Sequence, residues 1–266
     1  MQNRMEGAVV CWQSEMDFDI VMNESLSIRT AAMDAKTIIE RMRKQGAVER
    51  ARVSQSFFKT GPGEYGEGDV FFGLTVPQVR ALAKEFRALP ESETLKLLHS
   101  PVHEARLLAL LILVGAYAKG TEAARERIYG LYLKNTRWIN NWDLVDCSAE
   151  HIVGAHLWTR DRSVLEALAV SALLWERRIA ILATFHFVRR GEFGDTLRIA
   201  ERLMGDREDL IHKASGWLLR EVGKRDCAAE KEFLKAHCRT MPRTMLRYAI
   251  ERFPEEERRR YMRGDC

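Results

Sequence analysis

The sequence lacks the cysteine pattern that marks a disulfide-stapled protein or a zinc site. Its five cysteines are an odd number, lie far apart and include no C-x-x-C pair. Such usage is typical of proteins in a reducing compartment. We therefore expect no disulfide framework and no metal site, and we expect a cytoplasmic protein.

Long hydrophobic runs are also missing. The most apolar stretch, Leu107–Ala118, is shorter than the about 20 residues that cross a membrane, and it is better interpreted as a buried helix. The first residues include Asp17 and Asp19 and lack the basic-then-apolar order of a signal peptide. Because residues 1–33 show no clear hydrophobic period, we expect a flexible extension there, followed by a single domain over residues 34–266 with no membrane contact.

Strand patterns are absent after residue 75, where apolar residues recur at helical spacing and do not alternate. Four helical segments begin at Glu104, Asn140, Glu176 and His212, each 36 residues after the one before, and other amphipathic helices lie between them. A two-helix unit that repeats every ~35–45 residues is typical of an α-solenoid. We predict an all-α superhelix of antiparallel helix pairs, in which one helix of each pair lines a concave face.

Aligning the repeats places Trp142 and Arg178 at the same position of successive units. Asp146 follows Trp142 by four residues, which puts the two side chains on one face of a helix. A carboxylate beside a large aromatic ring is unusual for a core face, because burying an unpaired carboxylate is costly. The alternative is that Asp143 is a helix N-terminal acid favoured by the helix dipole and that Trp142 is a packing residue.

Basic residues gather on the same helices, although the formal net charge is only +4. They are Arg177, Arg189, Arg190, Lys213, Arg220, Lys224, Arg225, Arg243 and Arg247. A basic groove with aromatic residues set in it is typical of a nucleic-acid-binding surface. For any single one of these charges, a solvated helix face is the alternative.

The glycine-rich stretch Lys59–Asp69 invites interpretation as a phosphate-binding loop. It has no G-K-[ST] ending and no preceding strand, and its three acidic residues would repel phosphate. We interpret it as an ordered loop at the edge of a site. The tryptophans outside the predicted site, including Trp175, are interpreted as packing residues.

These patterns together resemble the AlkD-type DNA alkylation-repair glycosylases, which are built from HEAT-like helical repeats. The resemblance covers about residues 34–255. The matching stretches are Phe71–Pro77, the W-D-L-V-D of Trp142–Asp146, Trp175–Leu182 and the K-A-S-G-W-L-L-R-E of Lys213–Glu221. It implies a HEAT-like α-solenoid that binds double-stranded DNA containing alkylated purines and is located in the cytoplasm, at the nucleoid when bound. We expect a monomer.

The resemblance also assigns roles to individual residues. It makes Asp146 the catalytic carboxylate, Trp142 and Trp217 the aromatic contacts to the lesion-bearing sugar, and Arg178 the arginine of the same cleft. The predicted DNA-backbone contacts are Arg220 by resemblance and, from the basic cluster, Lys213, Arg177 and Arg190.

The expected chemistry fits these residue types. A purine alkylated at N3 or N7 is cationic and leaves readily, while the deoxyribose gains oxocarbenium character. A carboxylate such as Asp146 can stabilise that charge and activate water, and tryptophan faces attract cations. Neither a metal, another cofactor nor a nucleophilic lysine is required. We therefore predict a monofunctional DNA glycosylase.

A second function class stays open, namely a non-catalytic HEAT-like scaffold that binds DNA structures or a protein partner. A scaffold has no need for a carboxylate in a basic groove, where its charge opposes phosphate binding. The presence of Asp146 in the Trp142, Arg178 and Trp217 set therefore favours the enzyme.

Overall fold

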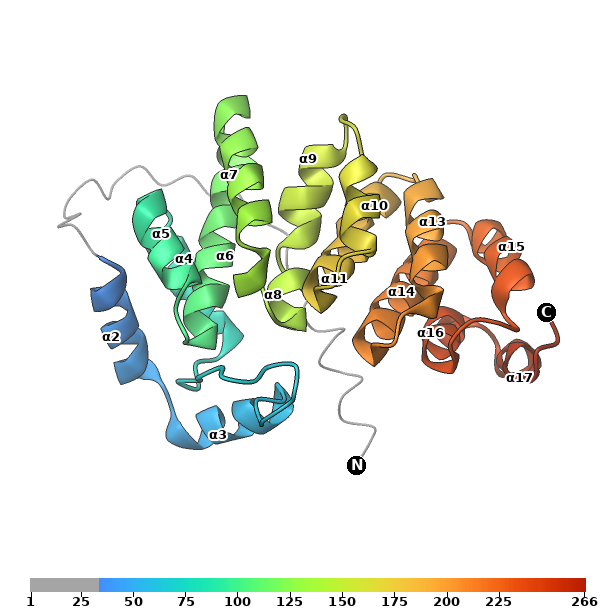
Figure 1. The fold of residues 1–266 in the computed structure, drawn as a ribbon, viewed down its shortest axis with the longest axis horizontal. Coiled ribbons are helices and arrows are strands. Elements are labelled where there is room, and N and C mark those ends of the chain that lie inside the picture. Colours follow the sequence, from blue (N-terminus) through green and yellow to red (C-terminus); the bar gives the residue numbers. More distant parts are fainter. Residues whose placement is uncertain (1–33) are drawn as a thin grey trace. The chain divides into compact units, whose positions relative to one another are not determined.

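The computed structural model describes residues 34–266, and the flexible extension predicted for residues 1–33 lies outside the described residues. Within the described range the chain is helical, and the β-structure there is an isolated bridge between Val70 and Val102. The all-α prediction is therefore confirmed (Figure 1).

The described part of the chain forms a succession of short helices. They are α2 (Ala35–Gln45), α3 (Val48–Phe57), α4 (Val76–Glu85), α5 (Glu91–Leu98), α6 (His103–Lys119), α7 (Glu122–Lys134), η2 (Thr136–Trp138), α8 (Trp142–Asp146), the π-helical turn η3 (Glu150–Gly154), α9 (Ala155–Leu157), α10 (Ser163–Ala169), α11 (Leu174–Ala183), α12 (Phe185–Val188), α13 (Gly194–Arg202), η4 (Leu203–Gly205), α14 (Asp209–Gly223), α15 (Cys227–His237), α16 (Arg243–Ala249), η5 (Ile250–Arg252) and α17 (Glu255–Arg263).

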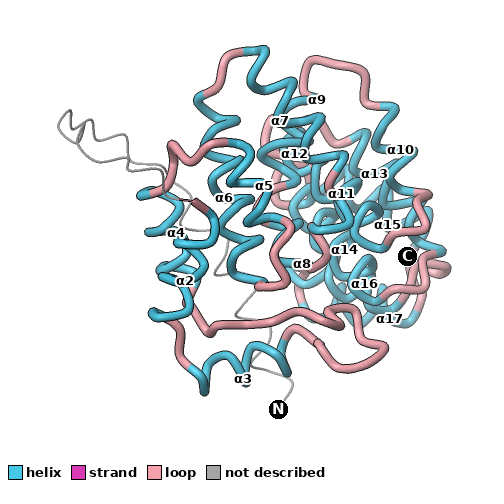
Figure 2. Tube along the Cα trace, turned by 60° about the vertical axis from the view of Figure 1, so that its left-hand side comes forward, coloured by secondary structure: helices cyan, strands magenta, loops and turns pink. Residues whose placement is uncertain are grey.

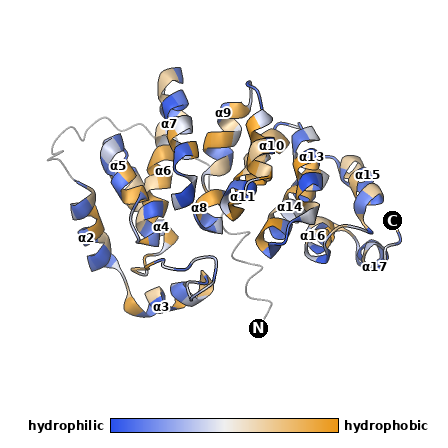
Figure 3. Cartoon of the chain, in the orientation of Figure 1, coloured by the Kyte–Doolittle hydropathy of each residue, from blue (hydrophilic) through white to orange (hydrophobic). Residues whose placement is uncertain are grey.

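The 36-residue repeat corresponds to one layer of helices. The four predicted helix starts fall in or just before α6, α8, α11 and α14, and each of these helices packs against the next. The intervening helices α7, α10 and α13 pack against α6, α11 and α14 (Figure 1). Helices α7 and α13 carry both hydrophilic and hydrophobic stretches (Figure 3), as expected for helices with one face against a neighbour. The fold is an α-solenoid of helix pairs.

Helix α4 begins where its sequence predicts a start. Thr75 and Gln78 form a capping box, in which the Thr75 hydroxyl accepts from the Gln78 N–H at 3.4 Å and the Gln78 side chain accepts from the Thr75 N–H at 2.8 Å. Pro77 lies in the first turn, where its missing N–H costs nothing. The chain before this cap is the long segment that doubles back beside α3 (Figure 2).

Two backbone segments cross closely at Gly73, which lies just before this cap. Its φ is +79°, and a Cβ added there would lie 2.2 Å from the Ala47 carbonyl oxygen. The position therefore requires glycine for conformation and for space.

We expect Gly73→Ala to lower the free energy of unfolding by about 2 kcal/mol or more, because a left-handed conformation alone costs about 1–2 kcal/mol for an L-residue. Gly115→Ala is the matched control, since a Cβ at that helical glycine meets nothing within 4 Å. It should be neutral or stabilise by up to about 1 kcal/mol. Urea unfolding of both variants tests this, and equal stabilities would refute it.

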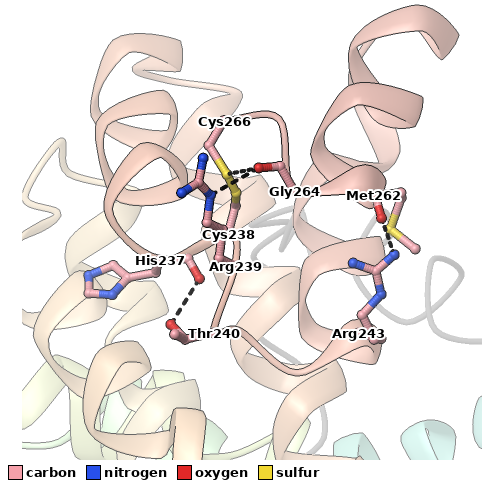
Figure 4. The surroundings of a disulfide bond; sticks show 8 residues. All are labelled: His237, Cys238, Arg239, Thr240, Arg243, Met262, Gly264 and Cys266. Carbon is pink, nitrogen blue, oxygen red and sulfur yellow. Dashed lines mark hydrogen bonds between the residues drawn. A yellow bond between two sulfur atoms is a disulfide. The ribbon is translucent and has the colours of Figure 1, made fainter.

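One disulfide corrects the expectation from the cysteine pattern. Cys238, just after α15, pairs with Cys266, 28 residues later in the sequence (Figure 4). Helix α17 returns the chain to α15, and the Arg239 guanidinium donates to the Gly264 carbonyl at 3.1 Å. The spacing of the cysteines in the sequence did not indicate that Cys238 and Cys266 would lie close together. Cys147 and Cys227 are free thiols.

No helix within residues 34–266 combines the length and the apolar character needed to cross a membrane.

Candidate functional site

The residue pair at the centre of the predicted site is Asp146 with Arg178. The Arg178 guanidinium donates from Nε to Asp146 Oδ1 and from Nη2 to Asp146 Oδ2, both at 2.8 Å. Its third nitrogen, Nη1, donates to the Leu210 carbonyl at 2.6 Å. The side chains of Asp146 and Arg178 are 18% and 7% exposed. Helices α8, α11 and α14, from three successive repeats, are thus joined at one guanidinium.

Two effects compete at the Asp146 carboxyl. Burial raises its pKa above the ordinary value, Arg178 opposes the rise through its charge and its hydrogen bonds, and Asp143 adds to it. The net effect is a raised pKa. A carboxylate that is more basic than usual is a better acceptor for the proton of an attacking water.

Trp142 occupies the start of α8 inside a cluster of aromatic rings. Asn141 caps the helix, with its side-chain oxygen accepting from the Trp142 N–H at 2.9 Å. Phe58 stacks on the indole at a centroid distance of 5.3 Å, and Phe57 meets it edge-on at 5.8 Å. Only 8% of Trp142 is exposed. One face of the predicted lesion-contacting ring is therefore covered, as in the packing alternative.

Asp143 also matches the alternative considered from the sequence, since it lies in the first turn of α8. It does more than interact with the helix dipole, however. Its Oδ2 lies 2.8 Å from Nε2 of His103, whose Nδ1 lies 3.0 Å from Oδ2 of Asp69. Arg106 completes the group, with Nη2 2.5 Å from the same Asp69 oxygen. All four side chains are almost completely buried.

The two carboxylates hold His103 as a cation. Burial alone would lower the pKa of His103, but the charge and hydrogen bond of Asp143 and the hydrogen bond of Asp69 raise it to about 9. In the same way His103 and Arg106 overcome burial and lower the pKa of Asp69. Two acids and two bases make the group electrically neutral. It ties α6 and α8 to the end of the glycine-rich loop.

The chain beyond that loop is fixed to the same helix. One buried carboxylate, that of Glu104 in α6, accepts from the backbone N–H groups of Phe72, Gly73 and Leu74 at 2.7–3.2 Å. Three donors on one carboxylate are strongly favourable in a dry environment. The stretch Phe71–Pro77, which supported the resemblance, therefore binds to α6 through its backbone.

Trp217 lies on α14, two turns after Leu210, whose carbonyl binds Arg178. Its ring packs edge-on against Phe185 at 4.9 Å and is 6% exposed. Two basic side chains also border Phe185, since the guanidinium groups of Arg189 and Arg225 lie 4.7 and 5.8 Å from its ring centroid. The sequence placed Trp217 on the site's side, and its contact with DNA stays a prediction.

Two of the four predicted backbone contacts are engaged within the protein. Arg177 binds both oxygens of Asp206, with Nε 2.6 Å from Oδ2. Arg220 is 7% exposed and forms ion pairs with Glu221 and Glu251. Burial makes the pKa of Arg220 lower than usual. Acidic side chains of the protein therefore already bind both guanidinium groups, and their contact with the DNA backbone stays a prediction.

The other two predicted backbone contacts remain accessible. Lys213 is 40% exposed and pairs with Asp209 at 2.8 Å on the same helix, an arrangement that contributes little at a surface. Arg190 is exposed, with its guanidinium 5.3 Å from the Trp158 ring centroid.

Sequence reasoning missed Tyr65 and interpreted Trp175 as packing alone. The Tyr65 ring meets Trp175 edge-on at 5.8 Å, and its hydroxyl accepts a hydrogen bond from the Trp142 indole N–H. Burial, as the largest effect, raises the pKa of Tyr65. The sequence did offer a signal for Tyr65. It is an aromatic residue at the centre of the glycine-rich loop, which the sequence analysis had placed at the edge of a site.

Comparison with known proteins places the chain in a family. The family model described as "DNA alkylation repair enzyme" matches residues 38–253. No curated protein is significantly similar in sequence. Among solved structures, a predicted DNA alkylation repair enzyme from Enterococcus faecalis is similar, with 16% identity and a TM-score of 0.63 over 79% of this chain and 97% of that one. At that identity the likeness shows the fold alone.

A second solved structure, smu.31 from Streptococcus mutans UA159, has 15% identity and a TM-score of 0.46 over 88% of this chain and 98% of that one. The family model spans most of the sequence and includes all the stretches on which the resemblance was based. The chain belongs to the DNA alkylation repair enzyme family.

Proposed function

We propose that this protein is a monofunctional DNA glycosylase that hydrolyses the N-glycosidic bond of cationic N3- or N7-alkylated purines in duplex DNA. The observation that carries the proposal is the Asp146–Arg178 pair, a mostly buried and geometrically fixed carboxylate next to the aromatic cluster around Trp142. Family membership supports a DNA substrate.

The pairing with Arg178 leaves Asp146 able to act. An ionised carboxylate has about four lone-pair sites, and the guanidinium uses one on each oxygen. The remaining sites can accept a proton from water or face a developing oxocarbenium ion. Arg178 then acts as a positioning residue, because its two parallel hydrogen bonds and its bond to the Leu210 carbonyl hold the carboxylate in one orientation.

Lys213 and Arg190 are proposed as contacts to the DNA backbone, since both are accessible cations. Such contacts fix the register of the protein on the duplex and carry no sequence information. For Arg177 and Arg220 we infer a mainly structural role within the protein, because acidic partners already bind them.

A second candidate is the non-catalytic scaffold, and one observation favours it. Arg177 forms the same two-bonded pair with Asp206, whose side chain is only 5% exposed. A two-bonded guanidinium–carboxylate pair can therefore serve structure alone in this fold. The two candidates differ in whether Asp146 supports chemistry.

The distinguishing experiment measures release of 7-methylguanine and 3-methyladenine from methylated duplex DNA. We expect the protein to release at least one of these bases well above the spontaneous rate and to leave the abasic strand uncut, because no amine nucleophile takes part. No release, together with salt-dependent DNA binding, would refute the glycosylase and support the scaffold.

A further inference from the structure

The disulfide between Cys238 and Cys266 is a covalent link between helices α15 and α17 (Figure 4). Its two cysteines differ in their access to solvent. Cys238, directly after α15, is 2% exposed, whereas Cys266, three residues after α17, is exposed. A thiolate in solution can therefore approach the bond from Cys266, which makes Cys238 the leaving sulfur in an exchange reaction.

Helix α17 has little apolar packing of its own. All nine of its residues, Glu255–Arg263, are at least partly exposed. Tyr261 meets Phe253 edge-on at a centroid distance of 5.6 Å, and Glu257 pairs with Lys231 at 3.0 Å. A helix of this length is marginal in water without tertiary packing. The position of α17 therefore depends on the bonds that tie it to the rest of the protein.

The last turn of α17 is tied to the chain that follows α15. The Arg243 guanidinium donates to the Met262 carbonyl, and the Arg239 guanidinium donates to the Gly264 carbonyl at 3.1 Å (Figure 4). Cations at the end of a helix are favourable, but each contributes little at a surface. The disulfide constrains the same turn covalently and joins positions 28 residues apart, which makes it the stronger constraint.

A basic cavity borders the leaving cysteine. Cys238 lines a cavity of about 280 Å³ with Arg239, Arg243 and Arg263. Arg263 pairs with Asp265 at 3.1 Å, but Arg239 and Arg243 donate to neutral carbonyl groups, and these bonds leave their positive charges uncompensated. Cations near a sulfur stabilise its thiolate, and a stabilised thiolate leaves more readily. The surroundings of Cys238 therefore favour opening of the disulfide.

We propose that Cys238 and Cys266 form a reversible thiol–disulfide exchange site, at which a dithiol reductant releases helix α17 from α15. A thiolate of the reductant attacks the Cys266 sulfur, the sulfur–sulfur bond breaks, and Cys238 leaves as a thiolate. The second thiol of the reductant then attacks the reductant's own sulfur in this mixed disulfide, which frees Cys266 and closes the reductant into a disulfide. Two electrons and two protons pass from the dithiol to the two cysteines.

The overall cysteine pattern supports an exchangeable bond over a permanent one. The odd number and wide spacing of the cysteines predict a reducing compartment. Protein disulfides in such a compartment are usually transient and serve catalysis or redox sensing. The pair lies outside the candidate site around Asp146, so the proposal is independent of the proposed glycosylase function.

The test compares trypsin cleavage within α17, at Arg258, Arg259 and Arg260, in oxidised protein and in protein reduced with dithiothreitol. Both samples are capped with iodoacetamide before digestion, and the fragments are analysed after full reduction, so that the disulfide cannot hold cut pieces together. We expect reduction to raise the cleavage rate at these arginines about tenfold or more, because a released α17 is largely unfolded. An unchanged rate would overturn the proposal.

Two variants show whether this particular bond is responsible. Cys266→Ser cannot form the bond, so its α17 should be cleaved at the rate of the reduced protein with or without dithiothreitol. Cys227→Ser is the matched control, because Cys227 is an exposed free thiol at the start of α15. It should respond to reduction as the wild type does. A response to reduction that persists in Cys266→Ser, or that is lost in Cys227→Ser, would contradict the proposed site.

Reversibility is tested by returning the reduced wild type to oxidised glutathione. We expect the peptide that links Cys238 to Cys266 to reappear in the peptide map, together with slow cleavage within α17. A pair that stays reduced under these conditions, or slow cleavage that does not return with the bond, would show that the two cysteines are not a reversible link.

Discussion

Replacing Asp146 by asparagine is expected to lower the rate of base release by about 10²–10⁴-fold, the range typical of losing a catalytic proton acceptor or a preorganised charge. Asparagine keeps the shape of the side chain but cannot stabilise an oxocarbenium ion by charge or accept a proton from water. Binding of alkylated duplex DNA should be retained, because removing a negative charge does not weaken contact with phosphates. Single-turnover release of 7-methylguanine and equilibrium binding measure the two effects separately.

The structure supplies a matched control for this variant. Asp146→Asn weakens the pair with Arg178, and the loss of hydrogen bonds to a charged group costs about 1.5–3 kcal/mol. Asp206→Asn weakens an equivalent two-bonded pair with Arg177. We expect both variants to lose stability to a similar extent in urea unfolding, and only Asp146→Asn to lose base release.

Other results would lead to different conclusions. Equal losses of release in both variants would attribute the effect to stability and remove Asp146 from the chemistry. Full activity of Asp146→Asn would keep the glycosylase and discard the proposed role of the carboxylate. Either result is clear only if both variants are folded at the assay temperature, which the unfolding curves establish.

The fold class could be predicted from the sequence, because the spacing of apolar residues within each segment is enough to identify the helices of a repeat. The 36-residue spacing and the helical period of apolar residues predicted which segments form helices, and the structure places them in α6, α8, α11 and α14. The same alignment put Asp146 and Arg178 on one side of neighbouring repeats, and they form an ion pair. Periodicity fixes the face of a helix, so side chains on facing positions could be anticipated.

The partners of charged and aromatic residues could not be anticipated in the same way. Asp69, His103 and Asp143 come from a loop and two helices, 34 and 40 residues apart in sequence, and no repeat relates them. Arg220 and Lys213 look alike in a basic helix, yet one is buried against acids and the other is accessible. Likewise, nothing in the sequence indicated that the Phe58 ring would cover one face of the Trp142 ring.

Replacing His103 by alanine is expected to lower the free energy of unfolding by about 3–5 kcal/mol, because removing one partner of a buried ion pair leaves an uncompensated charge. Asp143 would lose its partner, while Asp69 would keep Arg106. Phe58 and Phe71 lie 4.8 and 4.5 Å from the imidazole centroid and would also border a cavity. The loss is large against the total of about 5–15 kcal/mol for a typical domain.

The pH dependence identifies the charge of His103 as the cause. Its pKa is raised from the ordinary 6.5 to about 9, so the stabilisation is complete below about pH 6.5 and is lost as the pH rises through 9. The difference in unfolding free energy between wild type and His103→Ala should therefore shrink from pH 6 to pH 9.5. His99→Ala is the control, since that histidine is exposed, with Nε2 2.7 Å from the Asn135 amide oxygen and its ring tilted against Trp138. It should change stability by less than about 1 kcal/mol. A difference between wild type and His103→Ala that stays constant with pH would show that packing, and not the ion pairs, accounts for the cost, because the lost ring contacts with Phe58 and Phe71 do not titrate.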